Sequence, residues 1–126
     1  MKYIIDAFSW IEYLEGSEKG RKVHEILNSD SENFVLLMTI AEVISKVKRK
    51  GGNFKLAYDS MISDCRIANI SPKIAKEAGL LHAEYRKKML QFGIVDAILI
   101  TTARYLGAKV LTGDAHFKSF KEAIIL

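Results

Sequence analysis

The sequence predicts an α/β domain built on a parallel sheet. Short segments rich in β-branched and aromatic residues alternate with longer segments of helical periodicity, which is typical of βα units. The chain has 126 residues, 49% of them hydrophobic, so it can bury a core without disulfides or a structural metal. It contains no internal repeat, low-complexity tract or linker-like run, and we therefore expect one domain over residues 1–126.

Five segments are predicted as strands and seven as helices. The strands are expected over residues 2–5, 33–37, 66–70, 108–111 and 123–126. The helices are expected over residues 8–15, 18–28, 40–50, 54–63, 73–90, 95–106 and 115–120. Ser71 followed by Pro72 is typical of a helix start, while Gly16, Gly51 and Gly107 fall where helices should end.

Composition excludes several classes of protein. Apolar stretches such as 34–38 are far shorter than the roughly 18 to 20 residues that span a bilayer, and Asp6 interrupts the first apolar segment before a secretory signal can form. We therefore expect a cytoplasmic protein without membrane contact. Cys65 is the only cysteine, which excludes an intrachain disulfide and a Cys-based zinc site. The net charge of +4 permits a polyanionic partner without requiring one.

Four acidic residues lie close to the predicted carboxyl edge of the sheet. Asp6 ends the first strand, and Glu42 lies in the first turn after the second. Asp114 follows the strand that runs to Thr112, and Asp96 begins the helix before that strand. Because parallel α/β sheets bind ligands at this edge, the four side chains are expected to converge.

Each of these acids also has a purely structural explanation. Asp6 and Asp114 could be N-caps of the helices that follow them. Glu42 could close a capping box with Thr39, and Asp96 would be favoured in a first helical turn by the helix dipole. For each acid taken singly, the structural explanation is the better one.

The four acids taken together favour a metal site. Asp96 lies in the otherwise apolar segment 94–100, where an unpaired charge is costly to desolvate, so a distant Lys or Arg or a bound cation must neutralise it. Clustered carboxylates suit Mg²⁺ or Mn²⁺, whereas zinc prefers His or Cys. His24, His82 and His116 show no ligand spacing. His116 has two explanations, a position at the mouth of the site and a solvent-exposed role, and the second is at least as well supported.

Four segments carry a resemblance to a known family. They are YIIDAFSWI at 3–11, TIAEV at 39–43, GIVDAILITTA at 93–103 and LTGDAHF at 111–117. In this order and spacing they resemble the motifs of PIN-domain nucleases, and within them of the VapC-type toxins of prokaryotic toxin–antitoxin pairs. The resemblance implies a five-stranded, mainly parallel twisted sheet flanked by helices. It also implies that Asp6, Glu42, Asp96 and Asp114 form an acidic quartet, with Asp6 and Asp96 as the most direct metal ligands.

The same resemblance implies a function and partners. It predicts a Mg²⁺- or Mn²⁺-dependent ribonuclease, the toxin of a type II pair, with a cognate antitoxin and a homodimer to which the first helical region contributes. Thr112 matches a hydroxyl residue that often lines the family's pocket. The family frequently has Ser, Thr or Asn in the two positions after the first aspartate, but here they are Ala7 and Phe8, which leaves Ser9 as the nearest hydroxyl.

Substrate contacts are predicted from basic and aromatic residues. Lys46 and Arg49 belong to one basic cluster and Arg86 to another, and all three are candidates for RNA contact. Each cluster also ends a predicted helix, where the helix dipole favours basic residues anyway. Phe8, Trp10 and Tyr13 lie near helical spacing and are better explained by packing than as a platform for bases.

Three alternative functions remain open. A phosphoacceptor like a response receiver also uses strand-end acids, but it needs an early acidic pair, and Asp6 is followed by Ala7. A catalytically silent PIN-like module would bind RNA or protein without cutting. A housekeeping RNA-processing nuclease would share the active site.

Overall fold

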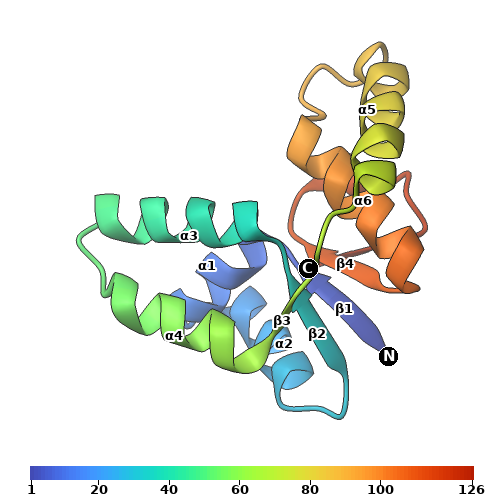
Figure 1. The fold of residues 1–126 in the computed structure, drawn as a ribbon. Coiled ribbons are helices and arrows are strands. Elements are labelled where there is room, and N and C mark those ends of the chain that lie inside the picture. Colours follow the sequence, from blue (N-terminus) through green and yellow to red (C-terminus); the bar gives the residue numbers. More distant parts are fainter.

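A five-stranded sheet runs through the molecule in the computed structural model, which describes residues 1–126 (Figure 1). Its strands are β1 (Lys2–Ile5), β2 (Glu32–Val35), β3 (Arg66–Ile67), β4 (Lys109–Thr112) and β5 (Ala123–Ile125). Their order is β3-β2-β1-β4-β5 and every pair is parallel. The predicted α/β class is therefore confirmed, and the sheet is entirely parallel.

Strand β1 lies at the centre of the sheet, where the chain changes direction across it. The chain first adds β2 and β3 on one side of β1 and then returns to add β4 and β5 on the other. The boundary between β1 and β4 is thus the topological switch point, and its carboxyl edge is the preferred ligand position in open α/β sheets.

Two apolar cores form because neighbouring strand residues point to opposite faces of the sheet. Ile5 and Leu111 belong to a core shared with α1 (Ala7–Glu15), α2 (Glu18–Leu27), α3 (Leu37–Arg49) and α4 (Phe54–Asp64). Ile4 and Val110 belong to the opposite core, shared with α5 (Pro72–Arg86), α6 (Ile94–Leu106) and the 3₁₀ helix η1 (Ala115–Phe117). In Figure 1, α5 and α6 lie together on one side, and α1, α3 and α4 on the other. No helix is long and apolar enough to cross a membrane.

The apolar run 34–38 was predicted as strand to residue 37, and this boundary is wrong. Strand β2 ends at Val35 and α3 begins at Leu37, three residues before the predicted start. Leu36 is fully buried while Leu37 is 61% exposed, so the run contains both a strand end and a helix start. The capping box between Thr39 and Glu42 is also wrong: Leu36 is the N-cap, and the buried Thr39 hydroxyl has no hydrogen-bond partner.

Three other elements are shorter than predicted. Helix α5 ends at Arg86, because the following turn brings Phe92 into the core against Tyr85 and Phe120. Strand β3 has only two residues, at the edge of the sheet. The last predicted helix is reduced to η1, after which the chain turns to bury Phe120.

Helix α2 packs directly against the end of α1 at Gly20. The Ser17 hydroxyl caps α2 by accepting a hydrogen bond from the Gly20 N–H at 3.0 Å. A Cβ atom added at Gly20 would lie 2.2 Å from the backbone oxygen of Glu12. By contrast, a Cβ atom added at Gly79, in α5, would have no heavy atom within 4 Å.

We predict that Gly20→Ala lowers the free energy of unfolding by about 1–3 kcal/mol, because the backbone of α1 must move to admit the methyl group. Gly79→Ala should raise it by about 0.5–1 kcal/mol, since alanine loses less entropy than glycine inside a helix. Urea unfolding of the two variants measures both effects. Equal stability of the two variants would contradict the direct packing of α2 on α1.

Candidate active site

Asp6 is held at the end of β1 by local hydrogen bonds. Its Oδ1 accepts a bond from the Ser9 N–H at 2.8 Å, so it caps α1, as one of its two explanations predicted. The residue is only 7% exposed, and this burial raises the pKa of the Asp6 carboxyl to about 6. The hydroxyls of Thr112 and Ser9 oppose the rise, and the negative charge of Asp96 adds to it.

Asp96 lies in the first turn of α6, where its Oδ2 accepts a hydrogen bond from the Gly93 N–H at 2.8 Å. Burial raises the pKa of Asp96, and the charge of Asp114 raises it further. His116 and His82 act in the opposite direction. The carboxylate of Asp96 is therefore close enough to that of Asp114 to be affected by its negative charge.

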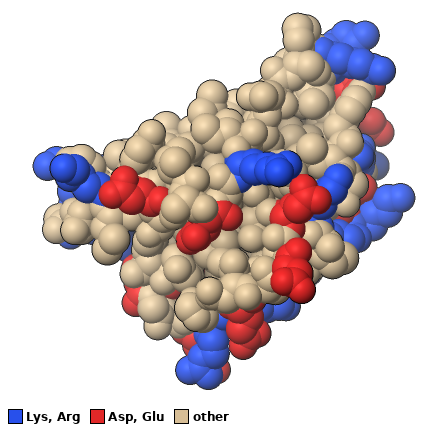
Figure 2. Space-filling model, turned by 60° about the horizontal axis from the view of Figure 1, so that its bottom comes forward, with Lys and Arg blue, Asp and Glu red and all other residues tan.

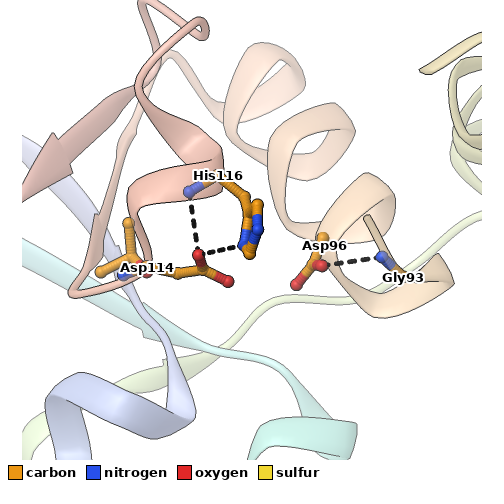
Figure 3. Close-up of polar contacts among 5 residues, drawn as sticks. Gly93, Asp96, Asp114 and His116 are labelled. Atoms are coloured by element: carbon orange, nitrogen blue, oxygen red, sulfur yellow. Dashed lines mark hydrogen bonds and ion pairs between the residues drawn. The ribbon is translucent and has the colours of Figure 1, made fainter. Parts of the chain in front are cut away.

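Asp114 follows β4 and is bound at Oδ1 by His116. The His116 backbone N–H lies 2.9 Å from this oxygen, and the ring Nδ1 lies 2.5 Å from it. Figure 3 shows the carboxylates of Asp114 and Asp96 facing the same space, with the His116 ring beside it. Asp114 thus caps η1 and takes part in the cluster, and His116 lies at the site, as one of its two explanations predicted.

Glu42 enters the cluster from α3, on the other face of the sheet from α6. The residue is exposed, but its carboxyl group is partly shielded from water, and this shielding raises its pKa. The second cause of the rise is the charge of Asp96. Since Asp96 also acts on Asp6 and is itself affected by Asp114, it is the carboxylate that links all four.

No Lys or Arg forms an ion pair with any of the four carboxylates. The pairs that involve Lys or Arg lie elsewhere and join Lys50 to Glu15, Arg66 to Glu32 and Arg104 to Glu122. Of the two sources of neutralising charge expected for Asp96, a distant Lys or Arg is thus excluded. A group of carboxylates without Lys or Arg, beside which His116 is bound to Asp114, fits a hard divalent cation such as Mg²⁺ or Mn²⁺.

The carboxylates do not form a ready-made set of metal ligands: no three His, Cys, Asp or Glu side chains are grouped closely enough to hold an ion. Local hydrogen bonds explain this, because Asp96 Oδ2 is turned to Gly93 and Asp114 Oδ1 to His116. The second oxygen of each of these carboxylates makes no hydrogen bond and remains free for a ligand.

Ser9 and Thr112, the predicted pocket hydroxyls, are fully buried behind the carboxylates. Ser9 Oγ donates to the Leu111 carbonyl at 2.8 Å, and Thr112 Oγ1 accepts from the Asp114 N–H at 3.0 Å. Both hydroxyls therefore fix the backbone that carries Asp6 and Asp114.

The predicted RNA-contact residues are divided between two parts of the surface. Lys46 and Arg49 line an open groove of about 510 Å³ together with Glu42 and Phe8, whereas Arg86 ends α5, outside this groove. Figure 2, a view tilted toward the bottom of Figure 1, shows basic and acidic side chains interspersed on this face. Although the chain has a net charge of +4, its basic residues therefore do not form one continuous basic surface on that face.

The early aromatic residues serve different purposes. Trp10 is fully buried, which confirms core packing and excludes it as a platform for bases. Tyr13 is half-buried and stacks on His24. Phe8 remains 40% exposed, and its ring contacts Gly113, a contact that sequence patterns did not indicate.

Comparison with known proteins identifies related folds. The model of the PIN domain family matches residues 3–123. A toxin–antitoxin complex from Klebsiella pneumoniae contains a chain with 22% identity and a TM-score of 0.78, covering 97% of this chain and 95% of that one. VapBC2 from Rickettsia felis, bound to a DNA fragment from its promoter, shows 22% identity and a TM-score of 0.75, with coverage of 100% and 98%.

A third similar structure is VapC20 from Mycobacterium tuberculosis, a toxin that cleaves the sarcin–ricin loop. It shows 13% identity and a TM-score of 0.71, with coverage of 94% of this chain and 95% of that one. No curated protein sequence matches the chain significantly. At these identities the three structures establish a shared fold.

We predict that the metal-free protein becomes less stable as pH rises from 3.8 to about 6. The folded state holds the Asp6 proton more tightly than the unfolded state, so deprotonation in this window costs folding free energy, by up to about 3 kcal/mol. The raised pKa values of Glu42 and Asp96 act in the same direction. Urea unfolding in EDTA at several pH values measures the effect.

Asp6→Asn should reduce this pH dependence without abolishing it, because asparagine can still cap α1 but carries no titratable proton. Asp59→Asn, on the exposed surface of α4, is the matched control and should leave the dependence unchanged. A wild-type pH dependence in Asp6→Asn would contradict the assignment.

Proposed function

The chain belongs to the PIN domain family, and we propose that it is a Mg²⁺- or Mn²⁺-dependent ribonuclease, the toxin of a type II toxin–antitoxin pair. This proposal rests on four carboxylates near the switch point of a parallel sheet that are electrostatically linked through Asp96 and make no ion pair with Lys or Arg. The cluster consists of Asp6, Glu42, Asp96 and Asp114.

In this proposal Asp6 and Asp96 hold the metal most directly. A bound divalent cation supplies a hydroxide nucleophile near neutral pH and neutralises charge that builds on the phosphate oxygens. Glu42 and Asp114 hold a second ion or orient the attacking water. The raised pKa values of Asp6, Glu42 and Asp96 support this assignment, because a cation bound beside these groups would stabilise their ionised form.

His116 and Thr112 are positioning residues in this scheme. His116 holds one Asp114 oxygen through its ring and its backbone, which leaves the other oxygen for a ligand or a water molecule. Thr112 Oγ1 accepts the Asp114 N–H and so fixes the start of the loop. These contacts hold Asp114 in place before any substrate binds, which lowers the cost of organising the site.

RNA is the proposed substrate class on grounds of charge and family. The carboxylates repel phosphate, so basic groups near the site must attract the substrate, and Lys46 and Arg49 lie on the same groove as Glu42. The similar VapC20 is a toxin that cleaves the sarcin–ricin loop, an RNA element, which favours RNA over DNA here.

A cognate antitoxin and a homodimer are the proposed protein partners. Similar structures are toxin–antitoxin complexes, and this chain has an apolar groove of about 340 Å³ between α1, α3 and α4, lined by Leu14, Val47 and Leu56 among others. Phe54, Tyr58 and Ile62 form an exposed apolar stripe on α4, each one turn from the next. Such surfaces are typical of protein contacts.

These two partners can be tested separately. Leu56→Glu should prevent an antitoxin from neutralising RNA cleavage, because it places a charge in the apolar groove. A single monomeric species in sedimentation equilibrium would exclude the homodimer.

We predict that purified protein, free of antitoxin, cleaves RNA in Mg²⁺ or Mn²⁺, and that Asp96→Asn lowers the rate by roughly 10²-fold or more. The reason is that Asp96 links the other three carboxylates. Gel analysis of labelled single-stranded and structured RNAs measures the rate. EDTA should abolish cleavage, and Asp59→Asn should retain the wild-type rate.

Cleavage that persists in EDTA or in Asp96→Asn would overturn the site assignment. RNA binding by Asp96→Asn should largely survive, because the substitution removes a metal ligand and no basic group. A folded, metal-replete protein that binds RNA without cutting it would instead favour the catalytically silent module.

A further inference from the structure

The ring of Phe8, in the first turn of α1, is fixed along one edge although the residue is 40% exposed. That edge faces Gly113, where an added Cβ atom would lie 1.9 Å from the ring carbon Cε1, 2.3 Å from Cδ1 and 2.6 Å from Cζ. The Lys19 Nζ, from α2, lies over the ring at 5.4 Å from its centroid. Phe8 therefore contacts the residue that precedes Asp114 and is itself covered by a residue of α2.

The ring of Phe8 also explains why residue 113 is a glycine. The backbone of Gly113 does not require glycine, because positive φ angles occur only at Gly16, Gly51 and Gly107. The three atoms nearest to an added Cβ atom at position 113 all belong to the Phe8 ring. A side chain at this position would therefore displace the ring, and the two residues are matched in shape.

Two contacts attach the first turn of α1 to the segment that leaves β4. One is the hydrogen bond that the Ser9 hydroxyl donates to the Leu111 carbonyl at 2.8 Å. The other is the ring contact with Gly113, two residues farther along the same segment. Asp6 caps this turn of α1, and Asp114 directly follows the glycine. Both contacts therefore act on the position of one carboxylate relative to the other.

The ring contact has no substitute in the hydrogen bonds of the Asp114 loop. The Asp114 N–H donates to Thr112 Oγ1, and the Asp114 carboxylate is bound by His116, so these bonds determine the shape of the loop. None of the hydrogen bonds made by residues 113–116 reaches α1. The loop beyond Thr112 is thus attached to α1 through the ring.

We propose that Phe8 and Gly113 form a matched pair that holds Asp114 in place relative to Asp6, which makes Phe8 a positioning residue of the metal site although it donates no ligand. The inference deepens the proposed function, since it rests on the carboxylates as the place where a divalent cation binds. Contacts that orient metal ligands in advance raise the affinity for the metal. Phe8→Ala deletes the ring, and Gly113→Ala turns it away, because a partly exposed side chain can rotate.

Hydrogen exchange measured by NMR in EDTA tests the pair without a metal. Phe8→Ala and Gly113→Ala should each speed exchange of the Asp114 and His116 amides about tenfold, because the loop that holds their acceptors becomes less ordered. The double variant should exchange no faster than either single variant, since both substitutions remove the same contact. Phe8→Tyr keeps the ring and should exchange like the wild type.

Mn²⁺ binding tests the consequence for the metal site. The six-line electron paramagnetic resonance signal of free Mn²⁺ falls when the ion binds, so a titration gives Kd. Phe8→Ala and Gly113→Ala should each weaken binding about tenfold, and the double variant by the same factor. Phe8→Tyr should bind within about twofold of the wild type, because it retains the contact.

Two variants are matched controls. Gly79→Ala adds a methyl group where no heavy atom lies within 4 Å. Tyr105→Ala removes an aromatic ring that is 47% exposed and has the Lys73 Nζ over it at 5.8 Å, at the far end of α6 from Asp96. Both should leave Mn²⁺ affinity and the exchange of the Asp114 and His116 amides unchanged.

Two results would overturn the proposal. One is wild-type Mn²⁺ affinity in Phe8→Ala or Gly113→Ala, with circular dichroism showing that the variant is folded. The other is a double variant whose loss of affinity equals the product of the single losses, because the two residues would then act independently.

Cleavage assays distinguish these failures from a failure of the proposed function. A wild-type protein that binds Mn²⁺ but cuts no RNA would reject the nuclease, while a shared loss of Mn²⁺ affinity in the two single variants would still support the pair. RNA cleavage together with wild-type Mn²⁺ affinity in both single variants would reject the pair and leave the nuclease standing.

Discussion

The parallel pairing of β1 with β4 is the constraint on which the candidate site depends. Ile5 is paired with Leu111, so the segments that leave the two strands emerge side by side. The Leu111 carbonyl oxygen accepts bonds from the Asp6 N–H at 3.2 Å and from the Ser9 hydroxyl at 2.8 Å. A register shift of one residue would exchange the two faces of β1 between the two cores and separate Asp6 from the loop that carries Asp114. The packing that stabilises the sheet therefore also determines the position of the carboxylates.

The aspartates of the cluster are oriented by backbone N–H donors, and Asp114 is held in addition by the His116 ring. Asp6, Asp96 and Asp114 each accept a hydrogen bond from a backbone N–H two or three residues away in the chain. Capping and site formation, which looked like competing explanations for these residues, are therefore compatible. This arrangement fixes the side chains without a Lys or Arg beside them, and burial raises the pKa values of Asp6 and Asp96. Such a site lowers the stability of the metal-free fold, and burial in the two cores must offset that cost.

Local patterns predicted most of the fold and the candidate acids. Alternating periodicity identified the segments that form strands and helices, and the acids were found because each lies within a few residues of a strand end or a helix start. The same reasoning misplaced the start of α3, because an apolar run such as 34–38 has no periodicity that separates a strand end from a buried helix start. It could not find the contact of Phe8 with Gly113, since those residues are far apart in sequence and meet only through the pairing of β1 with β4.

The central position of β1 has a consequence for synthesis. Although β1 leaves the ribosome first among the strands, its neighbour β4 follows only after every helix from α1 to α6. Until β4 is made, Asp6 lacks the Leu111 carbonyl and the Thr112 hydroxyl behind it, and Asp114 does not yet exist in the chain. A nascent or truncated chain that stops before β4 can collapse around α1 to α4 but cannot assemble the carboxylate cluster. For a protein proposed to cut RNA, this topology delays the appearance of activity until the ribosome has nearly finished making the domain.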